Sequence, residues 1–599
     1  MPPTEPRIVA DVRQSETLDR LIVTPRRPTT ALELKAAMGT AFPGVPLTRL
    51  AQGVAVSAAD SPRLIEEPLS LRFVFTEEAR RFSVNRARAR RLQPALREAV
   101  EGLRQANRGT ALARLAGLEG ASTLDDHQVI NVAAMTHPAC YGLCLFDEQG
   151  AGKTVSVIYA WDLLASRDEV DLALIIAPKS MVPEWLSDLH RFKGDLYTAR
   201  AVVGSDRDKR RALSSSADVL VTNFETVVAM EKELTAILRR LDGRSVLVAD
   251  ESFMVKNLDA QRTKALRRLR EWCGSAYVLC GTPAPNSAHD LIQQFSLADF
   301  GLTFDGVIVP DEREAAHEVI KRAVDERGIY LRHLKREVLP DLPPKSFDVV
   351  RLEMKPVQSR SYEAALQSLI IDLQSTDDDG FRRRLTSFMA RRSALLQICS
   401  NPSALVPGYE ETPAKLDALE EILTELIAGN GEKVVVWSFF TASLEAVVER
   451  FGRFGPVRYD GTVTDVSQRR DAVRSFQEDE ATRLFVGNPA AAGAGLTLHA
   501  ARHAIYESFS NQAAHYLQSL DRIHRRGQDR DVRYIVLLCQ ETIEEAEFER
   551  LRGKERRAQV LLGDNADAPV TREGMLGELL LTATGNEPRR TERPRGVSP

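Results

Sequence analysis

Short apolar segments alternate with amphipathic segments of helical length from about residue 120 onward, and this pattern limits the choice of fold more than any other. Runs rich in Val, Ile, Leu and Ala that are separated by helices are typical of parallel βαβ units. The runs form two sets, at residues 141–146, 173–177, 218–222, 245–249 and 276–280, and at residues 433–437, 456–459, 483–487, 503–506 and 532–538. The sequence therefore predicts an α/β protein with two parallel-sheet lobes.

The segments outside these two sets have different compositions. Residues 301–413 are mostly helical and charged, with a loop at 377–380 and a linker at 406–413. The first hundred residues are rich in Pro and Arg, whereas residues 585–599 hold too few apolar side chains to fold. We expect five parts: an accessory N-terminal domain at 1–115, a first lobe at 116–300, a helical insertion and linker at 301–413, a second lobe at 414–562, and a C-terminal segment at 563–599 that ends in a disordered tail.

The charges of the chain nearly balance, because 80 Lys and Arg residues face 84 Asp and Glu residues. A net charge of -4 gives no overall attraction to phosphate, so any nucleic acid must bind to a local patch or cleft. The six cysteines lack the spacing of a zinc site and indicate buried thiols in a reducing compartment. There is no signal-peptide pattern, and the longest apolar run, near residues 434–442, is too short to span a bilayer. We therefore expect a cytoplasmic protein without membrane contact.

Residues 147–154, with the sequence DEQGAGKT, follow a predicted strand and precede a predicted helix. In that context Gly150, Ala151 and Gly152 allow backbone N–H groups to approach an anion, and the helix N-terminus adds a favourable dipole. The segment is therefore a candidate phosphate-binding loop.

The two residues that end this loop carry the chemistry of a nucleotide site. Lys153 would pair with the β- and γ-phosphates, and the Thr154 hydroxyl would bind Mg²⁺. The strict phosphate-loop pattern has Gly where this chain has Asp147, so the loop alone does not establish the site. The surrounding sequence has to decide between a nucleotide site and a chance match.

An acidic pair supplies that context. Asp250 and Glu251 directly follow the apolar segment 245–249. A carboxylate at such a strand end can hold Mg²⁺ through water, and its neighbour can orient or deprotonate the attacking water. A solvated acidic pair at a strand tip is the alternative, but the position behind a phosphate loop favours a hydrolytic site.

A positive charge that meets the γ-phosphate would complete the site. Arg522 and Arg525, in the segment 518–528 of the second lobe, are the candidates. Because they lie on a different lobe from Lys153, hydrolysis would depend on lobe closure, which couples the nucleotide to inter-lobe geometry as in a motor.

Further short segments occur in a fixed order along residues 120–550, and together they resemble the Swi/Snf-type DNA translocases of helicase superfamily two. Two stretches, 337–345 (EVLPDLPPK) and 396–402 (LQICSNP), are close to segments specific to that family. The helicase-type segments are His127-Gln128, Ala177-Pro178-Lys179-Ser180 with Trp185, Thr222-Asn223-Phe224-Glu225-Thr226, Gly281-Thr282-Pro283, Trp437-Ser438-Phe439-Phe440-Thr441, Gly493-Ala494-Gly495-Leu496-Thr497-Leu498 and Asp521 to Gln528.

The resemblance implies two RecA-like lobes, with ATP and Mg²⁺ as cofactors and movement along double-stranded DNA. It also implies adenine contact by Gln128 and nucleotide contacts by Gly495 and Gln518. Contacts with the DNA backbone, which carry little sequence information, are implied for Lys179, Thr222, Asn223, Ser438 and Thr497.

The chain departs from the family pattern at three positions. Phe253 stands where the usual His follows the acidic pair, Pro285 replaces the usual Gln after Gly281-Thr282-Pro283, and Ser510 replaces an expected Trp. The hydrolytic residues are all present, so we expect a working ATPase with altered coupling.

Residues 80–97 contain seven arginines and no acidic residue. A solvated helix face is the favoured interpretation, and an accessory phosphate-binding patch is the alternative. We also expect protein partners to bind the N-terminal region, since no nuclease or methyltransferase motif accompanies the motor.

Three functions remain open at the level of sequence. The first is a double-stranded DNA translocase, by analogy the motor of a bacterial defence or DNA-processing complex. The others are a strand-separating DNA or RNA helicase, and a nucleotide-gated DNA-binding scaffold with weak hydrolysis, for which Phe253 is the motivating residue.

Overall fold

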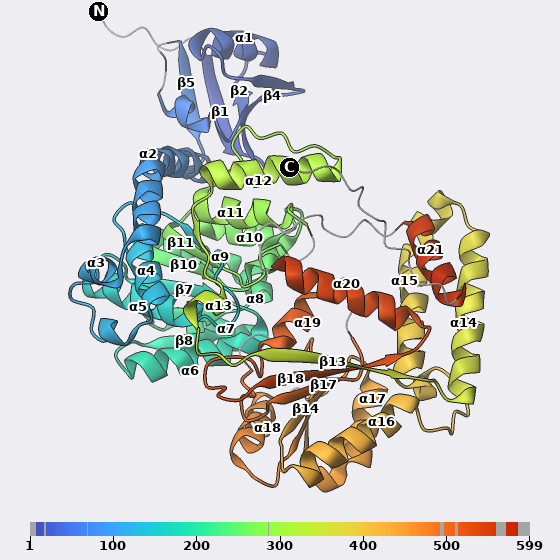
Figure 1. Ribbon diagram of the computed structural model, residues 1–599. Coiled ribbons are helices and arrows are strands. Elements are labelled where there is room, and N and C mark those ends of the chain that lie inside the picture. The colour runs from blue at the N-terminus through green and yellow to red at the C-terminus, as the bar shows by residue number, and fades with distance from the viewer. Residues whose placement is uncertain are drawn as a thin grey trace, which may run out of the picture. The chain divides into compact units, whose positions relative to one another are not determined.

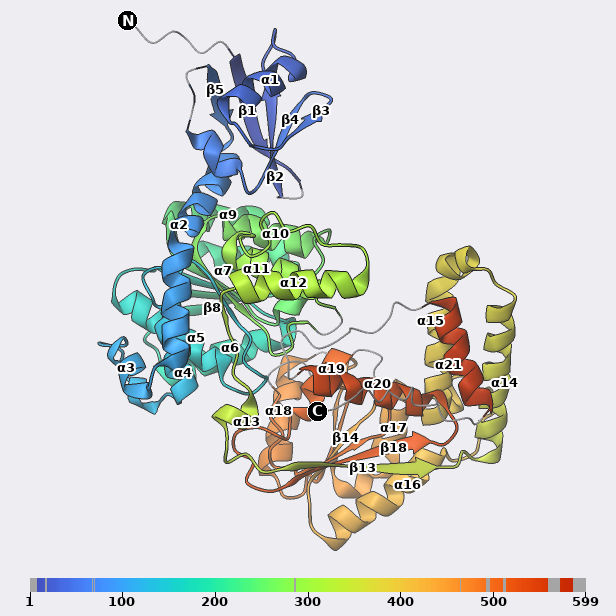
Figure 2. The same ribbon diagram turned by 45° about the horizontal axis from the view of Figure 1, so that its top comes forward.

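The computed structural model of the protein describes residues 8–16, 19–66, 68, 70–284, 287–463, 465–491, 496–509, 513–558 and 571–584. These residues form two compact units, the first built on residues up to Pro340 and the second on residues from Asp341 onward (Figure 1, Figure 2). Within these described ranges, no helix is both long and apolar enough to cross a membrane.

The first unit begins with a five-stranded sheet in the order β3-β4-β2-β1-β5. Helix α1 (Ala31–Ala41) contributes Leu34 and Met38 to a core that also contains Val12 and Val23 of the sheet. Because side chains alternate along a strand, the opposite face of the sheet carries the polar residues. The strands are β1 (Ile8–Gln14), β2 (Arg20–Pro25), β3 (Leu47–Leu50), β4 (Gly53–Ser57) and β5 (Leu71–Phe75).

The second sheet of this unit has seven parallel strands in the order β12-β6-β11-β10-β7-β9-β8. All five strands predicted for the first lobe are present. Two more were not predicted, because β8 is a partly exposed edge strand and β12 has only two residues. The strands are β6 (Leu143–Leu145), β7 (Leu172–Ile176), β8 (Ala199–Val202), β9 (Val219–Thr222), β10 (Gly243–Ala249), β11 (Cys273–Leu279) and β12 (Tyr330–Leu331).

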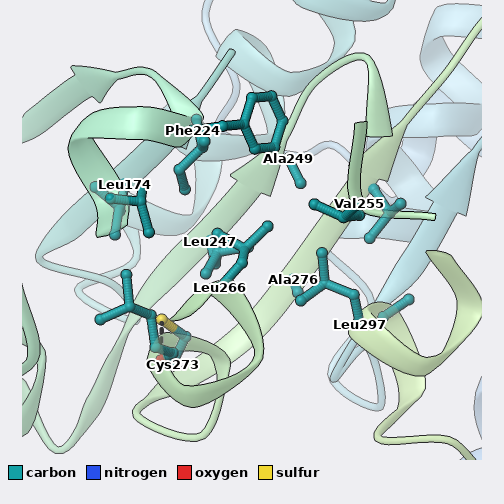
Figure 3. Close-up of a cluster of buried hydrophobic side chains, with 14 of the residues drawn as sticks. Leu174, Phe224, Leu247, Ala249, Val255, Leu266, Cys273, Ala276 and Leu297 are labelled. Carbon is teal, nitrogen blue, oxygen red and sulfur yellow. Dashed lines mark hydrogen bonds between the residues drawn. The ribbon is translucent and has the colours of Figure 1, made fainter. Parts of the chain in front are cut away.

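The core of the first lobe lies between this sheet and the helices that cover it. Alternate residues of β10, Leu247 and Ala249, belong to one apolar cluster with Phe224, Leu266 and Leu297, all of them buried (Figure 3). The helices of the unit after α1 are α2 (Glu77–Gln105), α3 (Arg108–Ala113), α4 (Asp126–Met135), α5 (Lys153–Ser166), α6 (Val182–Lys193), α7 (Asp206–Ser214), α8 (Phe224–Ala229), α9 (Glu231–Leu241), α10 (Gln261–Arg270), α11 (Asp290–Asp299), α12 (Arg313–Arg327) and α13 (Lys335–Val338).

The second unit is built on a six-stranded parallel sheet in the order β13-β18-β17-β14-β16-β15. All five predicted strands are again present, and β13 is additional. The strands are β13 (Lys345–Leu352), β14 (Val434–Trp437), β15 (Pro456–Tyr459), β16 (Leu484–Gly487), β17 (His503–Tyr506) and β18 (Val532–Cys539). The helices that follow the linker are α16 (Ala414–Leu423), α17 (Thr441–Arg450), α18 (Val466–Glu478), α19 (Ala513–Leu520) and α20 (Ile543–Ala558).

The expected helical insertion at residues 301–413 is divided between the two units. Its short strand β12 pairs with β6 in the first unit, and β13 pairs with β18 in the second. Only α14 (Pro356–Gln374) and α15 (Asp378–Ser400) form the expected pair of helices, joined at Asp377, whose side chain caps α15. The charged sequence of β13 hid this strand, because β13 lies at a sheet edge with most of its side chains partly exposed.

The C-terminal segment expected at residues 563–599 contains the helix α21 (Arg572–Thr584). Met575 and Leu579 of α21 are buried in one cluster with residues of α14 and α15, and Glu578 pairs with Arg392 of α15 at 2.6 Å. The predicted disordered tail, residues 585–599, lies outside the described residues.

Helix α2 carries the arginine-rich segment and packs along the first lobe. Arg86 is only 2% exposed and pairs with Asp305 at 3.0 Å, while Arg90 pairs with the same carboxylate at 2.7 Å. Arg81 donates to the Glu271 carbonyl at 2.9 Å. Several arginines of the segment therefore attach α2 to the lobe. Neither interpretation of the sequence, a solvated helix face or a phosphate-binding patch, predicts this role.

The expected N-terminal domain of residues 1–115 thus has two parts in the structure, a sheet that ends at Phe75 and helices that pack on the first lobe. Five arginines of the same segment are exposed, and two of them, Arg90 and Arg97, bond to Asp305 and to the Asp325 carbonyl. Arg80, Arg88 and Arg91 remain the candidates for a phosphate contact.

We expect Arg86→Ala to lower the free energy of unfolding of the first unit by about 3 kcal/mol, because it removes a buried ion-pair partner from Asp305. The exposed Arg88→Ala should change it by less than about 0.5 kcal/mol. Urea titration followed by tryptophan fluorescence measures both values. Equal and small losses of unfolding free energy in the two variants would contradict the role of Arg86 in attaching α2 to the lobe.

Candidate nucleotide site

The predicted phosphate loop connects β6 to α5 at the carboxyl edge of the first lobe's sheet. Gly150 and Gly152 have φ values of 83° and 85°, in the left-handed region that side chains disfavour. A Cβ atom on Gly152 would also collide with the Gln128 side-chain amide. The two glycines are therefore required by backbone conformation and by close packing, as a loop that wraps an anion requires.

Lys153 begins α5 and turns back over the loop. Its Nζ donates hydrogen bonds to the carbonyl oxygens of Asp147 at 2.8 Å and Glu148 at 3.4 Å. The side chain is largely buried, so its ammonium lies within the loop and not in bulk solvent. Thr154, the next residue, is half-buried in the first turn of the helix.

Asp147, the residue that departs from the strict loop pattern, anchors the loop from beneath. Its carboxylate is buried and accepts hydrogen bonds from Asn131 Nδ2 at 2.6 Å and from the His333 backbone N–H at 2.9 Å. The His333 ring nitrogen Nδ1 lies 2.8 Å from the same carboxylate. Burial alone would raise the pKa of Asp147, but the His333 and Asn131 contacts outweigh it and hold the pKa below its usual range.

The acidic pair lies at the end of β10, where both side chains are buried. Trp185 Nε1 donates to Asp250 Oδ2 at 2.9 Å, and the Glu251 amide donates to Asp250 Oδ1 at 2.9 Å. Gln149 of the phosphate loop donates to Glu251 Oε1 at 3.2 Å. Glu251 itself has a φ of 49°, a left-handed conformation that a non-glycine residue adopts only when its surroundings impose it.

The electrostatics of the pair suit a cation. Burial raises the pKa of Asp250 above its ordinary value, against the opposing effects of the Lys153 charge and the Trp185 hydrogen bond. A divalent cation at this carboxylate would offset the burial. Carboxylate and hydroxyl oxygens are the donors that Mg²⁺ prefers, so Asp250 and Thr154 fit that ion.

The residues predicted to read adenine lie beside the phosphate loop. Gln128 Oε1 accepts the Asp125 backbone N–H at 3.0 Å, which caps α4, while its Nε2 faces Gly152. His127 Nε2 lies 2.6 Å from the Ala151 carbonyl oxygen. The structure therefore places Gln128 at the loop, and its contact with adenine stays a prediction.

Arg522 and Arg525 converge within the second unit. Their guanidinium groups donate to the Leu496 carbonyl oxygen at 3.5 and 3.3 Å, respectively. Arg522 is 2% exposed, whereas Arg525 and Gln518 are half-buried. Gly495, predicted to contact the nucleotide, lies outside the described residues.

The predicted nucleic-acid contacts of the first lobe differ in accessibility. Lys179 is exposed at the turn before α6. Thr222 is fully buried and donates to the Val202 carbonyl at 2.8 Å, and Asn223 accepts the Thr226 amide at 2.8 Å as the cap of α8. Thr222 and Asn223 thus already hold partners inside the lobe, which leaves Lys179 as the accessible side chain of the three.

In the second unit, Ser438 is also buried, and its hydroxyl donates to Glu507 Oε2 at 2.7 Å. Thr497 is half-buried, and its carbonyl accepts a hydrogen bond from Gln477 at 3.0 Å. Ser438 therefore belongs to a buried polar network and does not present its hydroxyl to solvent.

Of the three departures from the family pattern, Phe253 is described: it packs, partly buried, against the apolar core of the first lobe. Pro285 and Ser510 lie outside the described residues. Sequence spacing gives no indication of Asn131 or His333. His333 follows β12, whose pairing with β6 joins distant segments, and Asn131 lies on α4, which packs on α5. The family resemblance includes Trp185 only as part of the segment that begins at Ala177, and it implies no contact between Trp185 and Asp250.

We expect Trp185→Phe to lower the rate of ATP hydrolysis roughly tenfold. A hydrogen bond to a charged group contributes about 1.5 kcal/mol or more of stabilisation, and the phenylalanine loses that contribution. Trp161→Phe is the matched control, since among the described residues the Trp161 Nε1 has no hydrogen-bond partner. Steady-state turnover at several Mg²⁺ concentrations compares the two. Equal effects would show that the Trp185 ring matters only as packing.

Comparison with known proteins identifies two regions. Residues 123–404 match the SNF2-related domain, and residues 414–527 match the helicase conserved C-terminal domain. Among solved structures, the chain is similar to the Sulfolobus solfataricus SWI2/SNF2 ATPase core in complex with dsDNA. The sequence identity is 22% and the TM-score is 0.34. The match covers 73% of this chain and 94% of that chain.

Curated relatives include the ISWI chromatin-remodeling complex ATPase CHR11 of Arabidopsis thaliana. It is 28% identical over an alignment of 468 positions that covers 72% of this chain and 41% of that protein. The putative ATP-dependent helicase/translocase YwqA of Bacillus subtilis is 27% identical, over 74% of this chain and 49% of that protein. The chain thus spans less than half the length of these relatives. With an SNF2-related domain followed by a helicase C-terminal domain, the chain belongs to the Swi/Snf-type family of helicase-like proteins.

Proposed function

We propose that the chain is an ATP-driven translocase that moves along double-stranded DNA. The observation that supports it most directly is the union of phosphate loop and acidic pair in the first unit, joined by the hydrogen bond from Gln149 to Glu251. A phosphate-binding loop beside two buried carboxylates is the arrangement that enzymes use to hydrolyse nucleotides.

In this proposal each residue of the first unit has a distinct task. Lys153 would exchange its carbonyl partners for the β- and γ-phosphates and neutralise their charge. Thr154 and Asp250 would hold Mg²⁺, which offsets charge on the transferred phosphoryl group. Glu251, fixed by Gln149, would orient the attacking water and accept its proton.

Arg522 and Arg525 would supply the remaining positive charge from the second unit. Both guanidinium groups donate to the Leu496 carbonyl oxygen, so the two positive charges lie close together in the second unit. Recruiting them only on closure would make hydrolysis depend on the arrangement of the two units, and each hydrolytic cycle would then drive a step along DNA.

The choice of DNA rests on the family and on the accessible Lys179. Backbone contacts of this kind bind duplexes without reading sequence. We further propose that the polar face of the N-terminal sheet, which exposes Asp11, Arg13 and Arg72, binds a protein partner within a larger DNA-processing or defence complex. The six cysteines are unpaired thiols, which supports a cytoplasmic location.

The proposal is tested by ATP hydrolysis with no nucleic acid, duplex DNA, single-stranded DNA or RNA. We expect duplex DNA to stimulate turnover most. We expect Lys153→Ala to abolish turnover without loss of fold, because the ammonium neutralises phosphate charge and is not part of an apolar core. Stronger stimulation by a single strand would favour the strand-separating helicase. Binding of duplex without any turnover would favour the scaffold.

We expect Arg522→Gln and Arg525→Gln to bind ATP almost normally but to lose turnover, by as much as about 10³-fold for a residue that acts as an arginine finger. Arg474→Gln, an exposed arginine of the same unit, is the control. ATP affinity is measured with a fluorescent analogue beside single-turnover hydrolysis. A parallel loss of affinity and rate would mean that the two arginines shape the ground-state pocket.

A further inference from the structure

A buried glutamine, Gln294 of α11, links two loops of the nucleotide site. Its Oε1 accepts a hydrogen bond from Ser252 Oγ at 2.7 Å, and its Nε2 donates to the carbonyl oxygens of Pro283 at 2.5 Å and Asp290 at 2.7 Å. Gln294 and Ser252 are both 0% exposed. The amide thus uses its acceptor and both of its donors inside the protein.

The surroundings of Gln294 are apolar. Its helical neighbours Leu291 and Phe295 belong to the core cluster of the first lobe, as do Val255 and Cys144. Burying an amide in such a place is unfavourable unless all its hydrogen bonds are made. An apolar side chain of the same length would fill the same space without that requirement, so hydrophobic packing alone does not explain a glutamine here.

The two ends of the link lie at the site. Ser252 directly follows Glu251, whose φ of 49° must be held in place by its neighbours. Pro283 lies just beyond β11, in a loop that starts at Gly281. At Gly281 a Cβ atom would come within 2.6 Å of Gln149 Oε1, so this loop packs directly on the phosphate loop.

These contacts close a ring. Gln149 donates to Glu251, Glu251 continues into Ser252, and Gln294 connects Ser252 to Pro283. The ring returns to the phosphate loop where Gly281 meets Gln149. The side chain of Phe253, next in the chain, has no polar atom with which to make such a link and packs against the core instead.

We propose that Gln294 is a positioning residue that fixes the Glu251 carboxylate through Ser252 and makes its position depend on the loop after β11. The proposal rests on the proposed function, since it assigns Glu251 to ATP hydrolysis. It predicts that breaking the link slows the chemical step while ATP binding is retained, because Gln294 lies beneath the site and touches neither phosphate loop nor Lys153 by a hydrogen bond that the structure describes.

The rival account is that Gln294 only satisfies buried polar groups. The two accounts differ for the double variant Ser252→Ala with Gln294→Met, which removes both side-chain partners and keeps the volume of the glutamine. If Gln294 is only structural, the double variant should recover both the melting temperature and the kcat lost by the single Gln294→Met variant.

We expect the double variant to recover much of the melting temperature lost by Gln294→Met, yet to keep a kcat roughly tenfold below that of the unchanged chain, with KM for ATP nearly unchanged. Gln358→Met is the matched control: Gln358 is also 0% exposed and donates to the Ile398 and Cys399 carbonyls at 2.8 and 3.0 Å, but lies in the second unit. It should lose melting temperature and keep its kcat without DNA.

Hydrolysis by the unchanged chain is measured first. If that chain does not hydrolyse ATP with any nucleic acid, the proposed function itself fails. If it does, recovery of kcat in the double variant, or an effect on KM alone, overturns the positioning role of Gln294 and leaves the proposed function standing.

Discussion

Parallel strand pairing is the constraint on which the nucleotide site depends. Because β6, β10 and β11 run in one direction and pair in the order β6-β11-β10, their carboxyl ends lie at one edge of the sheet. The phosphate loop, the acidic pair and the Gly281 loop each follow one of these strands. Residues far apart in sequence therefore meet without any long excursion of the chain, and a buried sheet holds them rigidly.

Burial at that edge gives the site its electrostatic character. Asp147 and Asp250 are both buried, yet their pKa values move in opposite directions, because Asp147 has His333 and Asn131 beside it while burial dominates at Asp250. Asp147 is therefore stabilised as an ionised carboxylate and has a structural role in the loop. At Asp250 a bound cation would offset the cost of burial, as the proposed binding of a magnesium–nucleotide complex requires.

The sequence predicted the features that local pattern encodes. Ten strands, the glycines of the phosphate loop and the acidic pair were recognisable because apolar runs, left-handed turns and strand-end carboxylates leave a signature in consecutive residues. It did not predict β13, whose charged residues suit a sheet edge, or the attachment of Arg86 and Arg90 to Asp305, which a basic run conceals. The Gln294 link was equally invisible, since its partners are brought together only by the packing of α11 on the sheet.

The pairing of β12 beside β6 also defines a path for mechanical load. Glu148 of the phosphate loop donates its backbone N–H to the His333 carbonyl at 2.9 Å, and the Lys335 backbone N–H donates to the Glu148 carboxylate at 2.8 Å. The chain then leaves the first unit at Pro340. A pull on the connection between the units would therefore reach hydrogen bonds to the phosphate loop itself. In the proposed translocase, tension between the units would thus act directly on the loop that holds the nucleotide.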